Sequence, residues 1–291
     1  MRFPRRVGVA ASSEFPELDA GWPALRAALM AAGLDPVVVG WDGESAGGGN
    51  LDLVIVNYCW GYVTRLSAFL AWAERTAARS LVMNPVPALR WNSDKAYLSD
   101  LAAAGGPTVP TTFIAPGEPW SPPTGDYVIK PSVGSGGWWA ARYARGDREA
   151  AERHVAALHG AGQTVLLQPY QRSADTTGET AMVFFGGQFS HAVHKAALLE
   201  PDRGPADALW EREVITPTAP SARHLQLARA AMATVARRLG ETAYARVDVI
   251  DGNDGAPAVL EVELVEPSLF LPAAEGAAAR FVRVLAGLLG P

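Results

Sequence analysis

A predicted β-hairpin over 244–271 carries Arg246, Asp248, Glu261 and Glu263. Its two valine-rich strands flank a run of turn-forming residues, DGNDG. Pairing Asp248 with Glu261 puts all three carboxylates on one face, because residues two apart on a strand share a face. Hard divalent cations prefer oxygen ligands, and magnesium is usually held by one or two carboxylates plus substrate phosphates. The hairpin therefore predicts a metal and phosphate site.

This pairing also matches Ile250 with Val259, and it makes the opposite face of the hairpin apolar. That face is expected to pack toward a core and comprises Val247, Val249, Leu260 and Val262. Three carboxylates on one face repel one another unless a cation lies among them. A solvated acidic sheet face is the alternative interpretation. Arg246 lies on the same face as Asp248, and a surface with charges of both signs favours a phosphate site.

A second candidate is the segment 127–139, YVIKPSVGSGGWW, in which a predicted strand runs into a glycine-rich loop. The strand carries Lys130, and the loop contributes Ser132, Gly134, Ser135, Gly136 and Gly137. Glycine lets the backbone approach a ligand closely, and exposed backbone N–H groups bind phosphate. The loop matches neither GxxxxGK[ST] nor GxGxxG, and a glycine-rich hairpin turn would look the same. The lysine directly before it favours a phosphate-binding loop.

The apolar run VLLQPY ends in Gln168, Pro169 and Tyr170. A proline removes a backbone donor, so the chain is expected to leave the sheet there. An exposed backbone segment between two lobes is suited to hydrogen-bonding the edge of a purine base.

Other charged candidates depend on their surroundings. Asn92 or Ser93 is expected to cap a helix whose first turn holds Lys95, where a lysine is normally solvated. His191 and His194 lie three residues apart on a predicted strand, and therefore on opposite faces. That spacing argues against a joint metal site.

The composition is globular, with 49% apolar and 19% charged residues in a chain of 291. The net charge is −5 and no block of lysine or arginine occurs, which argues against a nucleic-acid partner. Cys59 is the only cysteine, which excludes an internal disulfide and a cysteine zinc site. No apolar run matches a signal peptide or a membrane helix. We therefore expect a cytoplasmic protein with no membrane partner.

The first third of the chain alternates predicted strands with helices, which implies a parallel sheet covered on both sides. Strands are expected at 6–10, 36–39, 51–57 and 81–84, and a helix at 18–32. Ligands of such sheets bind beyond the carboxyl ends of the strands. The residues there are candidates for substrate contact, with ordinary loop packing as the alternative; they are Ser12, Ser13, Asn57, Tyr58 and Trp60.

A proline-rich connector over 105–123 separates this sheet from the rest of the chain. We expect an N-terminal Rossmann-like domain over 1–105 and a central lobe with the glycine-rich loop over 106–166. A C-terminal lobe with the acidic hairpin would cover 167–291. Helices are expected at about 225–239, from an apolar stripe, and at about 277–289.

The order of these motifs resembles the ATP-grasp superfamily, which includes glutathione synthetase, D-alanine–D-alanine ligase and ribosomal-protein glutamate ligases. The resemblance covers about 91–271 and rests on Lys95, VIKPSVGSGG, LLQPY, GETAMVFF with HAVHK, and YARVDV with LEVELVEPS, in that order. It implies an α/β fold in which a parallel-sheet domain precedes two α+β lobes that clasp ATP. The segments from QPYQ to HAVHK and LEVELVEPSLFL resemble in particular the O-ureido-serine cyclo-ligases of cycloserine biosynthesis and related amino-acid ligases.

The resemblance implies how ATP would be held. Lys95 and Lys130 match the two lysines that hold the phosphates, and the loop 132–137 matches the flexible loop that closes over them. Gln168 to Tyr170 match the hinge that contacts adenine. Glu179 matches the acid near the ribose.

The resemblance also implies the reacting end of the site. Asp248, Glu261 and Glu263 match the ligands of magnesium, which we expect as two ions with manganese as a substitute. The family often has asparagine where this chain has Glu263, and a third negative charge should hold the ions at least as well. Lys195 matches a basic residue at the γ-phosphate, and Arg246 matches the arginine that stabilises an oxyanion.

The activity implied is ATP-dependent amide formation on a small amino-acid-type substrate, through an acyl phosphate, with release of ADP and phosphate. The segment NYCWG at 57–61 departs from the charged pattern expected there, so the substrates stay open. A kinase acting on a hydroxyl, a non-catalytic nucleotide-binding regulator and a protein-tail ligase are the alternatives. The strand tips lack the several basic residues that a polyphosphate acceptor needs, and three acidic metal positions argue against a regulator. A homodimer is left open.

Overall fold

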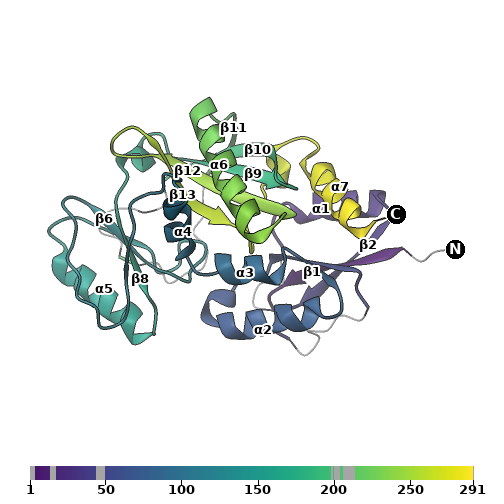
Figure 1. Cartoon of the computed structure of the whole chain (residues 1–291), viewed down its shortest axis with the longest axis horizontal. Coiled ribbons are helices and arrows are strands. Elements are labelled where there is room, and N and C mark those ends of the chain that lie inside the picture. Colours follow the sequence, from purple (N-terminus) through teal and green to yellow (C-terminus); the bar gives the residue numbers. More distant parts are fainter. Residues whose placement is uncertain are drawn as a thin grey trace.

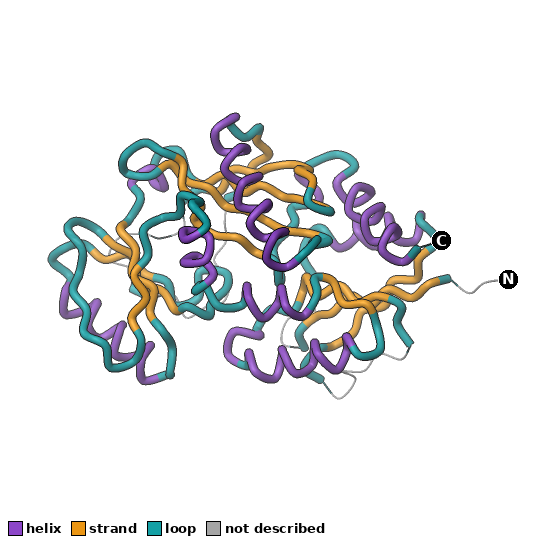
Figure 2. The backbone as a smooth tube through the Cα atoms, in the orientation of Figure 1, coloured by secondary structure: helices purple, strands orange, loops and turns teal. Residues whose placement is uncertain are grey.

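Three β-sheets with their covering helices make up the described chain (Figure 1). The computed structural model describes residues 4–13, 18–43, 50–197, 199, 204–205 and 214–290. The backbone trace separates a small sheet at one end from a larger sheet in the middle and the N-terminal sheet at the other end (Figure 2).

The N-terminal sheet is parallel, with the strand order β2-β1-β3-β4. Its strands are β1 (Arg5–Ala11), β2 (Leu34–Gly40), β3 (Leu53–Tyr58) and β4 (Leu81–Met83). The central strand β3 is buried along its whole length, as expected for a strand covered on both faces. Helix α1 (Trp22–Ala31) packs on one face and α2 (Leu66–Ala77) on the other. The parallel sheet predicted from the sequence is confirmed, although its first helix begins at Trp22 rather than near residue 18.

The small central sheet is antiparallel, in the order β5-β8-β6-β7. Its strands are β5 (Thr112–Ile114), β6 (Tyr127–Pro131), β7 (Ala141–Tyr143) and β8 (Val165–Pro169). Helix α5 (Arg148–Gly160) packs on this sheet through Ala151, Val155 and Leu158. The glycine-rich loop connects β6 to β7, so this sheet positions the loop.

The third sheet has five antiparallel strands in the order β11-β10-β9-β12-β13. They are β9 (Glu179–Phe185), β10 (Gln188–Lys195), β11 (Ile215–Thr218), β12 (Tyr244–Asp251) and β13 (Pro257–Glu263). Helices α4 (Tyr97–Ala103) and α6 (Ala222–Leu239) cover the face that carries Val247 and Val249. Helix α7 (Ala277–Leu289) lies beside α1, so the end of the chain packs against its beginning (Figure 1).

The acidic hairpin departs from the predicted register by one β-bulge. Asp248 lies opposite Glu261 as predicted, but Val249 then pairs with Val259. A bulge inserts one extra residue into one strand and so interrupts the alternation of its faces. The extra residue is Leu260, which lines a cavity instead of the core, so its predicted place on the core face is wrong.

Lys95 lies between two helices rather than in the first turn of one. Helix α3 (Val86–Asn92) ends before it, and α4 follows. The side chain of Asn92 does not cap a helix: it donates to the carbonyl of Val262 at 2.7 Å and accepts from the amide of Leu264 at 2.6 Å. The hydroxyl of Ser93 donates to the carbonyl of Arg90 at 3.4 Å, and α4 has no side-chain cap. The predicted cap is therefore wrong for both residues.

Each sheet lies mainly within one of the three segments predicted from the sequence, and we keep that division as a proposal. None of the described helices combines the length and the apolar character needed to cross a membrane.

A buried asparagine joins the N-terminal sheet to the five-stranded sheet. Asn84 follows β4 and is 0% exposed. Its Oδ1 accepts from the amide of Ala243 at 2.8 Å, and its Nδ2 donates to the carbonyls of Tyr244 and Leu264 at 2.9 and 2.8 Å. Buried backbone groups that lose a partner cost free energy, so this side chain contributes to holding the two sheets together.

We predict that Asn84→Ala lowers the free energy of unfolding by about 3 kcal/mol, because three buried backbone groups lose their partner. Chemical denaturation of the purified variant measures this. Asn50→Ala, at an exposed position, is the matched control and should stay within about 0.5 kcal/mol of the wild type. A loss below about 1 kcal/mol for Asn84→Ala would contradict the proposed role.

Candidate active site

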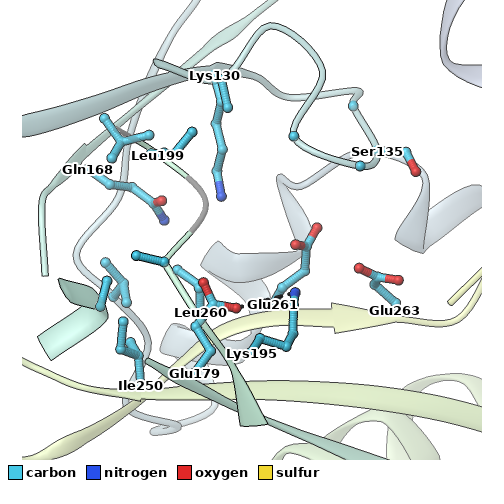
Figure 3. Close-up of a pocket in the computed structure, with 18 of the residues that line it drawn as sticks. Lys130, Ser135, Gln168, Glu179, Lys195, Leu199, Ile250, Leu260, Glu261 and Glu263 are labelled. Carbon is cyan, nitrogen blue, oxygen red and sulfur yellow. Dashed lines mark ion pairs between the residues drawn. The ribbon is translucent and has the colours of Figure 1, made fainter. Parts of the chain in front are cut away.

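A cavity of about 380 Å³ lies between the central sheet and the five-stranded sheet. Lys130 enters it from the side of the glycine-rich loop, and Glu261, Glu263 and Lys195 enter it from the hairpin side (Figure 3). It brings together most of the predicted site residues, which are Lys95, Lys130, Gly134, Ser135, Gly136, Gly137, Gln168, Pro169, Tyr170, Glu179, Lys195, Arg246, Glu261 and Glu263.

All three lysines of the chain line this cavity. Lys95 Nζ lies 2.8 Å from Glu261 Oε1 and donates to the carbonyl of Gly134 at 2.6 Å. Lys130 makes no ion pair with any described residue, and its burial lowers its pKa. Burial alone would also lower the pKa of Lys95, but the ion pair with Glu261 outweighs burial and raises that pKa. The two lysines thus differ in their readiness to lose a proton.

Asp248 is buried and contacts two cationic side chains that line the cavity. Its carboxylate is 1% exposed and accepts from Arg246 Nε at 2.8 Å and Arg246 Nη2 at 3.0 Å. Lys195 Nζ lies 3.2 Å from Asp248 and 3.4 Å from Glu179. Burial would raise the pKa of Asp248, but Arg246 and Lys195 outweigh burial and lower it. Asp248 therefore orients two cations rather than lining the cavity itself.

The two glutamates of the hairpin titrate in opposite directions. Burial would raise the pKa of Glu261, but Lys95 and Lys130 lower it below the usual range. Burial raises the pKa of Glu263 to about 8, although Arg246 donates a hydrogen bond to it. Within the described ranges, no three acidic, histidine or cysteine side chains form a ready-made metal cluster. Lysine and arginine instead neutralise the carboxylates of the hairpin.

The glycine-rich loop forms one wall of the cavity. Gly136 and Gly137 have φ angles of 58° and 75°, a region that favours glycine. Ser132 does not line the cavity, and its amide donates to the carbonyl of Thr164 at 2.8 Å, so its contact with a phosphate stays a prediction. The carbonyl of Ser132 accepts from the amide of Lys95 at 2.9 Å, which fixes this lysine beside the loop.

The end of the cavity away from the charges is apolar. Ile250 and Gln168 of the predicted hinge lie there, on the side away from Glu263 (Figure 3). Val128 and Leu260 add to the apolar lining of the cavity. Within the hinge, Gln168 Nε2 donates to Thr111 Oγ1 at 2.8 Å. The sequence did not predict Leu260 at the cavity because a bulge carries no clear signal in the sequence.

Sequence reasoning also missed the opposite end, where Glu266, Ser268 and Phe270 line the cavity. The one available signal was the acid directly before Pro267. Glu266 is 8% exposed, and burial raises its pKa to about 7. The hydroxyl of Ser135 and the positive charge of Lys95 offset that rise in part.

The substrate-contact candidates from the N-terminal strand tips do not line the cavity; they are Ser12, Ser13, Asn57, Tyr58 and Trp60. Both serine hydroxyls lie within 3.2 Å of the carboxylate of Asp42. Asn57 Nδ2 donates to the carbonyl of Pro267 at 2.5 Å, and the rings of Tyr58 and Trp60 pack edge to face. Their contact with substrate stays a prediction.

Sequence comparisons relate the whole chain to one family. Residues 7–84 match the family model described as the N-terminal domain of D-cycloserine synthetase DcsG. The cycloserine biosynthesis protein DcsG of Streptomyces lavendulae is 37% identical over 297 residues, covering 94% of this chain and 95% of that protein.

Structural comparisons agree with that relationship. The crystal structure of D-cycloserine synthetase DcsG matches with a TM-score of 0.88 at 34% identity, over 98% of this chain and 99% of that one. The D-alanine–D-alanine ligase of Bacillus anthracis, solved with ATP, gives a TM-score of 0.66 at 14% identity, over 98% of this chain and 97% of that one. The ATP-grasp ligase PsnB, solved with its minimal precursor, Mg and ADP, gives 0.61 at 16% identity, over 98% of both chains. The last two show the fold alone, and they confirm the ATP-grasp prediction. The chain therefore belongs to the family of the cycloserine synthetase DcsG and is an ATP-grasp enzyme that forms carbon–nitrogen bonds.

Proposed function

We propose that this enzyme uses ATP to activate the carboxylate of a small amino-acid-type substrate and joins it to an amine. ADP and phosphate would be released. The observation that carries this proposal is the layout of one cavity, with an apolar end, a middle lined by every lysine of the chain, and a charged hairpin beyond. These three parts suit a base, a chain of phosphates and a reacting carboxylate, in that order.

The apolar end suits adenine. Val128, Ile250 and Leu260 would lie against the faces of the base, and the hinge at Gln168–Tyr170 would meet its edge. The backbone amide of Tyr170 already donates to the carbonyl of Asp126, and the carbonyl of Tyr170 accepts from Asn253 Nδ2 at 2.8 Å. We therefore assign the adenine edge to backbone groups beside Tyr170 rather than to those of Tyr170 itself.

The lysines suit the phosphates. Lys130 is half-buried and forms no ion pair with any described residue, and a phosphate would supply an anionic partner. Lys95 bonds both Glu261 and Gly134, so it links the hairpin to the glycine-rich loop. Lys195 lies between Asp248 and Glu179, at the hairpin side. Glu179 would meet the ribose.

Magnesium fits the donor set of the hairpin. Glu261 and Glu263 present carboxylate oxygens to the cavity, and oxygen is the ligand that magnesium prefers. Asp248 would join them only by exchanging its arginine and lysine partners. When bound, one or two magnesium ions would neutralise charge on the phosphoryl oxygens, with manganese as a substitute.

Arg246 suits the final step. Asp248 and Glu263 hold its guanidinium from two sides, and its Nη1 donates to the carbonyl of Ser268 at 3.4 Å. A pre-oriented donor of this kind stabilises the oxyanion that forms when an amine attacks an acyl phosphate. The acyl phosphate makes the attack feasible because phosphate is a far better leaving group than oxide.

We infer that the substrate is an O-substituted serine such as O-ureidoserine, cyclised within one molecule. The support is the family, whose relative is described as a cycloserine synthetase. Membership of a ligase family disfavours the kinase and the regulator. The cytoplasmic location and the homodimer stay predictions.

The substrate assignment predicts that one compound suffices. The purified enzyme with ATP and magnesium should release ADP and phosphate when given a single enantiomer of O-ureidoserine. A requirement for two different amino acids would instead indicate ligation between molecules. No nucleotide turnover with O-ureidoserine or with paired amino acids would contradict the proposed function, and AMP with pyrophosphate would contradict the acyl phosphate.

The lysine assignment predicts selective chemical labelling. At pH 8, an amine-acylating reagent should modify Lys130 faster than Lys95, because the lowered pKa leaves more of Lys130 uncharged. Adding ATP and magnesium should slow the modification of both lysines about 10-fold or more, since the phosphates would pair with them. Peptide mass spectrometry follows each lysine separately.

A lysine introduced by Arg79→Lys, at an exposed position, is the internal control and should react equally with and without nucleotide. Unchanged labelling of Lys130 in the presence of ATP would argue against the lysine assignment.

The metal assignment predicts that Glu261→Gln lowers turnover about 100-fold and raises the magnesium concentration needed for half-maximal rate, because a charged ligand is lost. ADP formation against magnesium concentration measures both effects. Glu149→Gln, exposed on α5, is the control and should behave as the wild type. A Glu261→Gln variant with wild-type magnesium dependence would contradict the assignment.

A further inference from the structure

One acidic residue that lines the cavity, Glu266, forms no ion pair with any described residue. Asp248, Glu261 and Glu263 each contact a lysine or an arginine, and Glu179 lies within 3.4 Å of Lys195. Glu266 lines the same cavity, yet no lysine, arginine or histidine of the described chain lies within ion-pair distance of it. A cationic group of a ligand would therefore find an acidic partner at this position.

The side chains that hydrogen-bond Glu266 are uncharged, and Lys95 acts on it only through its electric field, which lowers the pKa of Glu266 in part. Its neighbours are the hydroxyls of Ser135 on the glycine-rich loop and of Tyr62 in a short 3₁₀ helix, η1 (Tyr62–Thr64). With 8% exposure, its carboxylate is largely removed from water. A buried carboxylate without a cation is costly unless a cationic ligand arrives, and burial accordingly raises its pKa.

The backbone around Glu266 is fixed from two directions. The carbonyl of Pro267 accepts from Asn57 Nδ2 at 2.5 Å, and the carbonyl of Ser268 accepts from Arg246 Nη1 at 3.4 Å. Glu266 is thus tied both to β3 of the N-terminal sheet and to the hairpin. A carboxylate held in this way can select a ligand group by position as well as by charge.

The charges at this end of the cavity are arranged for a zwitterion. Arg246 and the magnesium ligands would face the carboxylate of the substrate. Glu266, three residues beyond Glu263, is the acid of the described cavity lining that forms no ion pair with a lysine or an arginine. Ser268 and Phe270 complete this end. We propose that Glu266 binds the ammonium group of an α-amino acid whose carboxylate is the reacting group. The proposal rests on the proposed function and narrows the substrate class to acids with a free α-amino group.

The test compares matched substrates that differ only in the α-amino group. O-Ureidoserine, serine and alanine are each paired with the acid in which hydrogen replaces that group. Titration calorimetry with magnesium and a non-hydrolysable ATP analogue measures binding, and ADP release measures turnover. The wild type should bind the amino acid of at least one pair about 30-fold or more tightly than its partner, because a charged contact is lost in the partner.

Glu266→Gln should reduce that ratio to below about 5-fold, and Glu266→Asp should retain more of it because the charge remains. The affinity for the ATP analogue should stay unchanged in both variants. Glu241→Gln, exposed on the surface, is the matched control and should keep the wild-type ratio. A structural role of Glu266 would weaken both members of a pair equally and leave the ratio unchanged.

An unchanged ratio in Glu266→Gln would overturn the proposal, and so would a wild type that binds no amino acid better than its deaminated partner. Both of these binding results can be obtained without turnover, because the ATP analogue is not hydrolysed. Absence of ADP with every compound and every pair of amino acids would instead overturn the proposed function, which the binding ratio does not depend on.

Discussion

The structure depends on neutralising three buried or half-buried carboxylates on one hairpin. Asp248, Glu261 and Glu263 would repel one another on a shared face, and burial adds to the cost of their charge. Arg246 lies across the ladder from Glu263 and contacts Asp248 as well, so one guanidinium serves two acids. Removing one partner of such a buried pair typically costs about 3–5 kcal/mol. The arrangement that stabilises the hairpin is therefore also the one that orients its charged side chains at the cavity.

Three buried asparagines connect this hairpin to the N-terminal third of the chain. Asn57, Asn84 and Asn92 each hydrogen-bond backbone groups in the segment after or within β13, between Val262 and Pro267. Asparagine suits this role because its amide both donates and accepts. The N-terminal sheet thus fixes the exit of the hairpin, where Glu266 lies, although none of its predicted strand-tip residues lines the cavity.

Local periodicity and the order of the motifs were sufficient to predict the sheets and most of the cavity lining. The alternation of strands and helices indicated the parallel sheet, and strand period and turn position indicated the pairing of Asp248 with Glu261. The sequence did not reveal the bulge at Leu260, because an extra residue in a strand changes no composition. It did not place Lys95 either, since the partners of Asn92 lie about 170 residues away. Glu266 stood out only as an acid before a proline, and its meaning came from neighbours on other elements.

The measurement that tests the central claim most directly is the fate of oxygen in the reacting carboxylate. Substrate labelled with ¹⁸O in both carboxylate oxygens would be turned over with ATP and magnesium, and the released phosphate analysed by mass spectrometry. Transfer of the γ-phosphoryl group to the carboxylate predicts one ¹⁸O in each phosphate, with the other retained in the product. Phosphate without label, or label found in AMP, would contradict activation through an acyl phosphate.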